Sequence, residues 1–304
     1  MIELTADCFD EVCGAPTVRA QLGSLDTSRA AAMRKFRLYV GAGLILGPLS
    51  VWLLLGYGFE AWAWVIGAAA LLVPVFMAFG AVHAVGEALK VPVLETIAAR
   101  AGLEYMEGDF SPPVYPLARK ALFGSWLSSE RFTDLFHGAD AEGRGHAVYE
   151  ACLQRRSGKH TQTVFSGQVY ALQRRPGARG TVVIVPDRKI FNFFKPAKDL
   201  ERVKFDDVEP DFERWFEVYA SDPLEARQLL ADPAFRRRLL DYRKAGATYA
   251  WFGPDDALLA LAGKDRFEPG SMLRRRPGED RVKAMLDDVC AALAVLREFK
   301  AKLG

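Results

Sequence analysis

Two stretches without a charged residue decide the fold of this chain: LYVGAGLILGPLSVWLLLGYGF at 38–59 and AWAWVIGAAALLVPVFMAFGAV at 61–82. Each stretch has 22 residues. A helix of that length rises about 33 Å, which matches the roughly 30 Å hydrocarbon core of a bilayer. Soluble helices rarely keep every face apolar over such a length. We therefore predict two transmembrane helices that turn around Glu60 and form a hairpin.

Positive charge flanks the predicted hairpin at its two outer ends and is absent from its turn. The cations before the first span are Arg29, Arg34, Lys35 and Arg37, and those after the second span are Lys90 and Arg100. Because lysine and arginine are enriched at cytoplasmic ends, both termini are predicted to be cytoplasmic. A cleaved signal peptide would be shorter and would start nearer Met1. These features predict a multi-pass protein of the cell (inner) membrane that contacts the lipid bilayer.

The spans divide the chain into three predicted parts, which are a cytoplasmic N-terminal arm at 1–35, the transmembrane hairpin at 36–86 and a cytoplasmic domain at 87–304. The arm has apolar residues without sustained periodicity, so we expect it to be only partly ordered. Pro92 follows the second span closely and predicts a joint in the helix that continues from it. The domain therefore begins with a helix next to the membrane.

Beyond the hairpin the sequence changes to strand-like patterns, in which β-branched and aromatic runs are separated by turn residues. The expected strands are 132–137, 146–153, 161–173, 181–185, 213–219, 248–252 and 257–261. Asp222-Pro223 and Asp232-Pro233 predict the starts of two helices, because aspartate caps a helix and proline suits its first position. A short helix is expected after Pro113, and apolar spacing predicts a last helix at 279–303. The domain is expected to be α+β with a largely antiparallel sheet.

Composition argues against several functional classes. The formal net charge is only +2, and no basic and aromatic groove is visible in the sequence, so we expect no nucleic-acid partner. Cys8 and Cys13 form a pair with four intervening residues, without a second pair or a nearby histidine, which is not a zinc-site pattern. The chain has no P-loop, dinucleotide-binding fingerprint or nucleophile elbow. We expect neither a metal nor a cofactor.

Local motifs after the spans carry a resemblance to a known family. The motifs are Phe165-Ser166-Gly167-Gln168-Val169, Asp211-Phe212-Glu213-Arg214-Trp215-Phe216-Glu217-Val218-Tyr219, Asp222, and Ala226-Arg227-Gln228-Leu229-Leu230. In this order after a two-helix hairpin, the chain resembles an uncharacterised bacterial membrane-protein family, domain of unknown function 3137, from the spans to about residue 262. It departs from the family pattern at Ala231-Asp232-Pro233. The resemblance implies a membrane-anchored cytoplasmic domain without an established activity, and it assigns no catalytic residue.

The densest group of polar side chains lies between residues 134 and 150. Within it, His137, Asp140 and His146 are of types that bind metals or transfer protons. The two histidines flank a predicted turn, so they are candidates to face each other across a hairpin. A solvated hairpin explains the same residues, because Asp140-Ala141-Glu142-Gly143 is ordinary turn sequence. A membrane-associated hydrolase or metal-dependent enzyme built on these three residues is therefore the alternative hypothesis for function.

Two arginine runs are candidates for contact with lipid headgroups. They are Arg236, Arg237 and Arg238, and Arg274, Arg275 and Arg276. Beside an anionic inner leaflet, each well-placed cation is worth about 1 kcal/mol. Solvated helix and loop faces explain the same runs.

The leading hypothesis for function is a non-enzymatic cytoplasmic module that binds another protein or senses the membrane surface. It rests on a clear membrane hairpin beside a domain without an active-site signature. The expected partner is an unidentified membrane or cytoplasmic protein, and a homo-oligomer is possible. A third hypothesis is a small accessory subunit that packs its first span on other helices through Gly41, Gly43 and Gly47, because small residues allow close approach.

Overall fold

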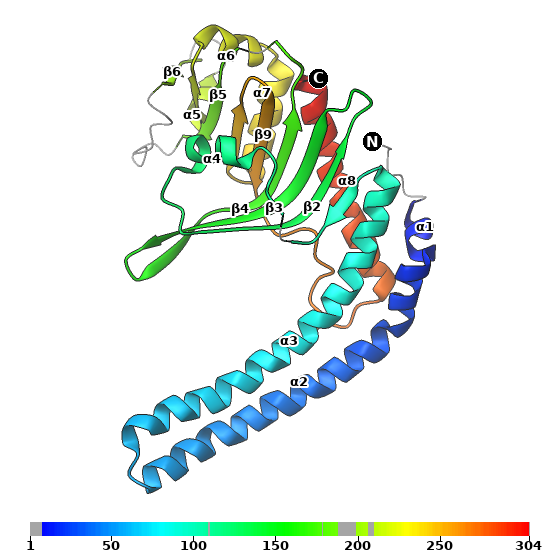
Figure 1. Ribbon diagram of the computed structural model, residues 1–304, viewed down its shortest axis with the longest axis vertical. Coiled ribbons are helices and arrows are strands. Elements are labelled where there is room, and N and C mark those ends of the chain that lie inside the picture. Colours follow the sequence, from blue (N-terminus) through cyan, green and yellow to red (C-terminus); the bar gives the residue numbers. More distant parts are fainter. Residues whose placement is uncertain (1–7, 109, 178, 188–198, 206–209, 304) are drawn as a thin grey trace. The chain divides into compact units, whose positions relative to one another are not determined.

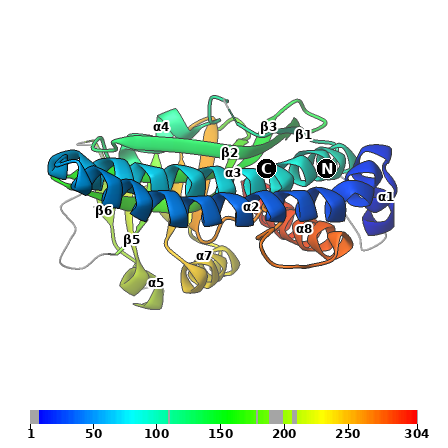
Figure 2. The same cartoon turned by 90° about the horizontal axis from the view of Figure 1, so that it is seen from below.

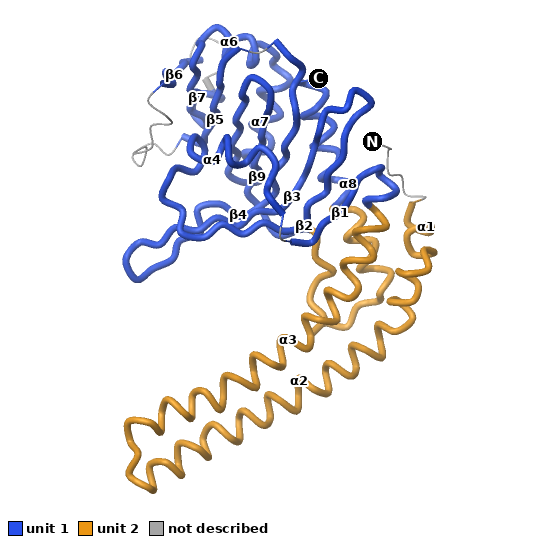
Figure 3. Tube along the Cα trace, viewed as in Figure 1, with its two compact units in different colours: residues 1–3, 98–266, 289–304 blue, residues 4–97, 267–288 orange. Residues whose placement is uncertain are grey.

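The computed structural model describes residues 8–108, 110–177, 179–187, 199–205 and 210–303 (Figure 1). The chain forms two compact units (Figure 3). The hairpin unit consists of Leu4–Ile97 and Phe267–Asp288, and the sheet unit consists mainly of Ala98–Arg266 and Val289–Gly304. The α+β class, the two long apolar N-terminal helices and the antiparallel sheet are confirmed. The predicted division into arm, transmembrane hairpin and cytoplasmic domain stays a prediction.

Two long helices form most of the hairpin unit. α2 (Pro16–Gly56) and α3 (Glu60–Ala101) run side by side in both views (Figures 1 and 2). By length and composition, both are long and apolar enough to cross a membrane. Only 11% and 17% of their most apolar windows is buried. A core helix of a soluble protein would bury most of such a window, so these apolar surfaces have little cover from the described protein.

The predicted partly ordered arm is helical in the residues that the structure describes; residues 1–7 lie outside them. α1 (Cys8–Gly14) is followed by the first half of α2. Val18, Leu25 and Ala32 of α2 are buried at seven-residue intervals. One buried residue every two turns makes a stripe much narrower than that of an ordinary amphipathic helix, so the sequence does not show a helical period here.

Glycines set the close contact between α2 and α3. Gly43 and Gly47 of α2 face α3, since a Cβ on Gly43 would lie 2.9 Å from the Leu71 carbonyl oxygen and one on Gly47 would lie 3.1 Å from Leu71 Cβ. Gly67 of α3 approaches Gly47 in return. Gly41 meets no atom within 4 Å. Two of the three glycines proposed to bind other helices are therefore used inside the hairpin.

Gly67→Leu is expected to weaken the pairing of α2 and α3 by about 1–3 kcal/mol. A Cβ at this position overlaps Val51 Cγ2 and lies 3.2 Å from the Gly47 carbonyl oxygen, so the helices must move apart. The measurement is the melting temperature of the full chain in detergent, with Gly41→Leu as the matched control because its Cβ enters open space. Equal melting temperatures for the two variants would contradict the packing.

The described residues of the sheet unit form a nine-stranded antiparallel sheet in the order β1-β2-β3-β4-β9-β8-β5-β7-β6. The strands are β1 (Glu104–Met106), β2 (Ser129–Ala139), β3 (Gly145–Ser157), β4 (His160–Gln173), β5 (Val182–Pro186), β6 (Glu201–Val203), β7 (Phe216–Ala220), β8 (Thr248–Phe252) and β9 (Asp256–Ala262). All seven predicted strands correspond to strands of this sheet, whereas the short β1 and β6 were not predicted.

Helices cover both faces of the sheet. The helices after the hairpin are α4 (Tyr115–Phe123), α5 (Pro210–Trp215), α6 (Pro223–Leu229), α7 (Pro233–Ala245) and α8 (Gly278–Leu303). α4 packs Tyr115 and Leu122 on one face, in a core with Leu135, Tyr149 and Trp251. On the opposite face, the ring of Phe252 in β8 contacts the rings of Phe235 in α7 and Phe299 in α8, with centroids 6.2 and 6.0 Å apart. We call these the α4 face and the α8 face.

Local signals predicted the helix starts well, but two other local predictions are wrong. Asp222 and Asp232 cap α6 and α7 by accepting backbone hydrogen bonds of 2.9 and 2.8 Å. The strand predicted at 213–219 begins instead as α5, in which the ring of Phe212 is buried against that of Phe216 at 5.1 Å. Pro92 does not end the helix, because α3 continues through this residue to Ala101.

Candidate functional site

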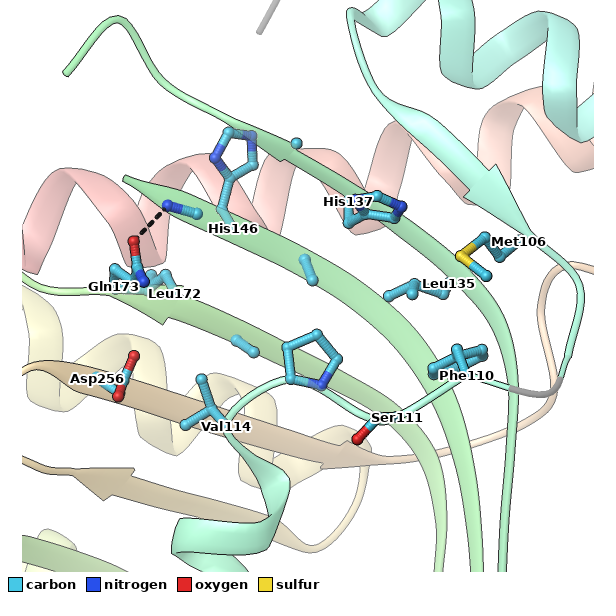
Figure 4. Close-up of a pocket in the computed structure, with 15 residues that line it drawn as sticks. Met106, Phe110, Ser111, Val114, Leu135, His137, His146, Leu172, Gln173 and Asp256 are labelled. Carbon is cyan, nitrogen blue, oxygen red and sulfur yellow. Dashed lines mark hydrogen bonds between the residues drawn. The ribbon is translucent and has the colours of Figure 1, made fainter. Parts of the chain in front are cut away.

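A pocket of about 640 Å³ lies on the α4 face of the sheet unit. Its floor is formed by β2, β3, β4 and β9, and the segment between β1 and α4 borders it (Figure 4). Apolar side chains of Met106, Phe110, Val114 and Leu135 line it, with polar groups at a few positions. Pockets with mostly apolar walls and a few polar groups are the usual form of ligand and peptide sites. This pocket is therefore the candidate functional site.

The segment that borders the pocket is held in a strained conformation. Val114 has a φ of 63°, in the left-handed region, where a β-branched residue is a rare outlier. The hydroxyl of the buried Tyr149 donates a 3.0 Å hydrogen bond to the Pro113 carbonyl oxygen and holds the segment in place. Such strain costs about 1–3 kcal/mol and is found mainly at binding and catalytic sites.

The polar groups of the pocket are spread around it. Gln173 accepts a 2.8 Å hydrogen bond from the backbone N–H of Gly145 (Figure 4). His137 Nε2 lies 3.6 Å from a carboxylate oxygen of Glu104, which is largely exposed. Burial, and then the neighbouring Asp255, raises the pKa of Asp256. These groups can orient a bound molecule at its edges, but they do not converge on one atom of it.

The structure separates the three residues of the predicted polar site. His137 pairs with Ala147 and Gly138 pairs with His146 in the β2–β3 register. Directly paired residues share a face and successive residues alternate, so the two histidines lie on opposite faces of the sheet. Both residues line the pocket, His137 from the α4 face, but the register places the side chain of His146 on the opposite, α8 face, where it is buried (Figure 4). They do not face each other across the hairpin.

Asp140 is engaged in structural contacts at the turn. Its carboxylate accepts backbone hydrogen bonds from Glu142 and Arg144 at 3.1 and 2.8 Å, and it forms an ion pair with Lys300 of α8 at 3.1 Å. Burial raises its pKa, but the Arg144 N–H and the Lys300 ammonium outweigh burial and hold the pKa well below its ordinary value. Burial and the same ammonium lower the pKa of His146. Asp140 therefore stabilises the hairpin turn and its contact with α8.

A buried carboxyl group on the α8 face did not enter the predicted site. Glu150 of β3 is only 5% exposed, and its Oε1 accepts a 2.8 Å hydrogen bond from the backbone N–H of Arg266. Burial, and then the carboxyl of Asp265, raises its pKa to about 9. The signal in the sequence was a single carboxylate inside the apolar run of a strand. Among the described residues, no three His, Cys, Asp or Glu side chains are grouped as metal ligands.

The two arginine runs differ. Arg236 is buried and donates to the carbonyl oxygens of Leu230 and Ala231, while Arg238 forms an ion pair with Glu298. The first run is therefore not one exposed cationic surface. Arg274, Arg275 and Arg276 are all exposed, in the loop of the hairpin unit before α8.

Comparisons with known proteins agree with the predicted resemblance. The family described as a protein of unknown function (DUF3137) matches residues 163–301. The match begins in β4, so it leaves out the two apolar helices, and it continues beyond residue 262 into α8. No curated protein matches the chain. The crystal structure of the mycobacterial trehalose monomycolate transport factor A, TtfA, is 15% identical over 67% of this chain and 93% of that chain. The TM-score of 0.31 is too low to support a conclusion about the fold or function of this chain.

Proposed function

We propose that the chain is a membrane-anchored, non-enzymatic binding module, with α2 and α3 crossing the bacterial inner membrane and both termini in the cytoplasm. The observation that carries the proposal is the exposure of the two apolar helices, whose most apolar windows are only 11% and 17% buried. A bilayer covers such a surface, and the cations at the outer ends of the hairpin favour the cytoplasmic side.

In this proposal the pocket on the α4 face receives an apolar group of a partner protein. Its apolar walls and its strained border support binding. The separation of His137 from His146, and the structural contacts of Asp140, give no support to the hydrolase alternative. The partner is either another protein or a second copy of this chain.

The membrane anchor predicts how cysteine probes will react in intact spheroplasts. In a chain whose four native cysteines are replaced by serine, Tyr57→Cys in the turn is expected to react with a membrane-impermeant maleimide from outside. Lys159→Cys in the sheet unit is expected to react only after lysis. Both native side chains are exposed, so accessibility alone does not separate them. Extraction of the chain by alkaline carbonate would contradict the anchor, and labelling of Lys159→Cys in intact spheroplasts would contradict the proposed orientation.

The pocket is tested with a photo-reactive benzoylphenylalanine in the full chain in membranes. At Ser111, which is exposed and lines the pocket, it is expected to form one adduct of defined mass. At Lys159, which lies outside the pocket, the same photo-reactive residue is expected to form no such adduct. The added His137→Trp change, which narrows the pocket, should weaken the adduct. Equal adducts at both positions, or an adduct that His137→Trp leaves unchanged, would rule the pocket out. An adduct with twice the mass of the chain would identify a second copy as the partner.

A further inference from the structure

Six exposed cations of the hairpin unit lie next to the ends of the apolar spans. Arg34, Lys35 and Arg37 belong to α2, and Arg274, Arg275 and Arg276 belong to the loop before α8. We call these six residues the basic collar. In the part of the chain that the structure describes, no carboxylate forms an ion pair with any of the six. Their charge is therefore not neutralised within the protein.

The loop that carries half of the collar is fixed to the long helices. Arg29 of α2 donates hydrogen bonds of 2.9 and 3.2 Å to the carbonyl oxygens of Met272 and Leu273. Lys90 of α3 forms an ion pair with Glu268 at 2.6 Å. Because these contacts fix the loop backbone, the side chains of Arg274, Arg275 and Arg276 extend from a defined position.

A buried arginine holds the loop from its other side. Arg281 of α8 is 1% exposed, and it donates to the carbonyl oxygens of Pro269 and Arg274 at 2.8 and 2.7 Å. Further hydrogen bonds of 3.2 Å reach Gly270 and Ser271. One guanidinium therefore bonds to four carbonyls of the loop, which is a strong constraint on its conformation.

The contacts place the start of the loop next to the end of the second span. Pro269 and Met272 lie within 4 Å of the place where a Cβ on Gly86 would stand. Gly86 is four residues beyond Val82, the last residue of the second span, or about 6 Å along the helix. The headgroup layer on each side of a bilayer is about 5–8 Å thick. The cations of α2 directly precede the first span at Leu38 and lie near this layer. Leu273 contacts Arg29, which is nine residues or about 14 Å before Leu38, so the loop arginines begin at the outer side of the layer.

The exposed acidic residues Asp26, Glu279 and Asp280 of the same unit lie farther from the outer ends of the spans, whereas Glu87, five residues beyond Val82, lies 3.4 Å from His83. Gly278, which precedes Glu279 and Asp280, packs on Leu22 and Leu25 of α2. Leu25 is 13 residues before Leu38, or about 20 Å along the helix, and Asp26 is next to it. That distance exceeds the Debye length of about 8 Å at physiological ionic strength. Asp26 is therefore separated from the cations of α2, whereas Arg276 lies only two residues before Gly278 and three before Glu279.

We propose that the basic collar binds the headgroups of anionic phospholipids in the leaflet that the hairpin enters. The inference rests on the proposed membrane anchor. In this proposal the inserted hairpin sets how far the collar lies from the hydrocarbon core. The loop adds three cations, and its contacts with the helices fix their position. Anionic lipid is thereby concentrated beside the loop, and the hairpin unit acquires a preference for membranes of that composition.

The test measures which lipid lies beside Leu273. The full chain, with its native cysteines replaced by serine and Leu273→Cys labelled with bimane, is placed in phosphatidylcholine nanodiscs. These contain a fixed fraction of brominated quencher lipid, either phosphatidylglycerol or phosphatidylcholine. The ratio of quenching by the two lipids reports the local enrichment of anionic lipid. We expect a ratio of about five or more, since one well-placed cation already concentrates an anionic lipid about fivefold.

Two changes should lower the ratio. Replacing Arg274, Arg275 and Arg276 together by glutamine is expected to reduce it by at least half. The matched control replaces Arg131, Arg156 and Lys159 by glutamine, which removes the same charge from exposed positions of the sheet unit, and should leave the ratio unchanged. In the chain without these glutamine changes, 0.5 M salt shortens the Debye length to about 4 Å and should bring the ratio near one.

A ratio of one in a chain that has inserted into nanodiscs would overturn the collar while leaving the anchor intact. A ratio that the loop variant preserves, or that the control lowers equally, would also overturn it. Failure of the chain to insert would instead refute the proposed anchor and the collar with it. The salt measurement uses the chain without loop substitutions, so it tests lipid binding by the collar even if the loop variant misfolds.

Discussion

Gly167→Ala is expected to lower the free energy of unfolding of the sheet unit by about 3–5 kcal/mol. Gly167 has a φ of 153°, which L side chains rarely adopt, and it pairs with Ala262 of β9. A Cβ there would overlap the Leu261 carbonyl oxygen and lie 2.8 Å from the Gly263 nitrogen. Backbone atoms of a central strand cannot move aside as a flexible side chain can. The alanine therefore separates β4 from β9.

The measurement is the urea midpoint of the full chain in detergent, read by pulse proteolysis of the sheet unit. Gly263→Ala is the matched control, because it makes the same chemical change a few ångströms away where the added Cβ meets no atom within 4 Å. The Gly167→Ala midpoint should fall far below that of the control. If the two midpoints coincide, the close approach of β4 and β9 is not as described.

Glu150→Gln is expected to make the sheet unit more stable than the original chain at pH 9, by roughly 2–5 kcal/mol, and to change little at pH 5. Burial, and then Asp265, raises the pKa of Glu150 to about 9 in the folded chain. The stability that protonated Glu150 supplies is complete below its ordinary value near 4.5 and is lost as pH rises towards 9. Glutamine stays neutral throughout and keeps the oxygen that accepts from Arg266.

Glu130→Gln is the control for this pH dependence, because the surroundings of Glu130 shift its pKa in the opposite direction. Burial raises the pKa of Glu130, but its bonds to Arg119 and Tyr115 outweigh burial and lower the pKa overall. Its contribution to stability is therefore present above about pH 4.5 and is lost as pH falls. Urea midpoints at pH 5, 7 and 9 should show Glu150→Gln gaining on the original chain towards alkaline pH, whereas Glu130→Gln stays below the original chain by a nearly constant amount at all three pH values. Parallel curves for Glu150→Gln and the original chain would show that Glu150 is not buried in its neutral form.

Much of the fold could be predicted because its signals are local. Twenty-two uncharged residues in succession indicate an apolar helix whatever surrounds it, and Asp222 and Asp232 cap helices through hydrogen bonds to residues two positions on. The sequence pattern did not predict the helix in the arm, because that helix buries only one residue every two turns. The role of Gly43 and Gly47 needed the partner helix, since small residues show no preference for one neighbour over another.

The sequence by itself determined the two apolar spans, the flanking cations, the α+β class and the residue types of the polar group at 134–150. Only the tertiary structure decided which side chains meet. In a hairpin, a register change of one residue moves a side chain to the other face, and the register that pairs His137 with Ala147 separates it from His146. Arg29 contacts the 269–274 loop across 243 positions of the chain, whereas Arg281 contacts it across 7 to 12 positions. Such contacts depend on how surfaces fit after folding, and no local pattern in the chain encodes them.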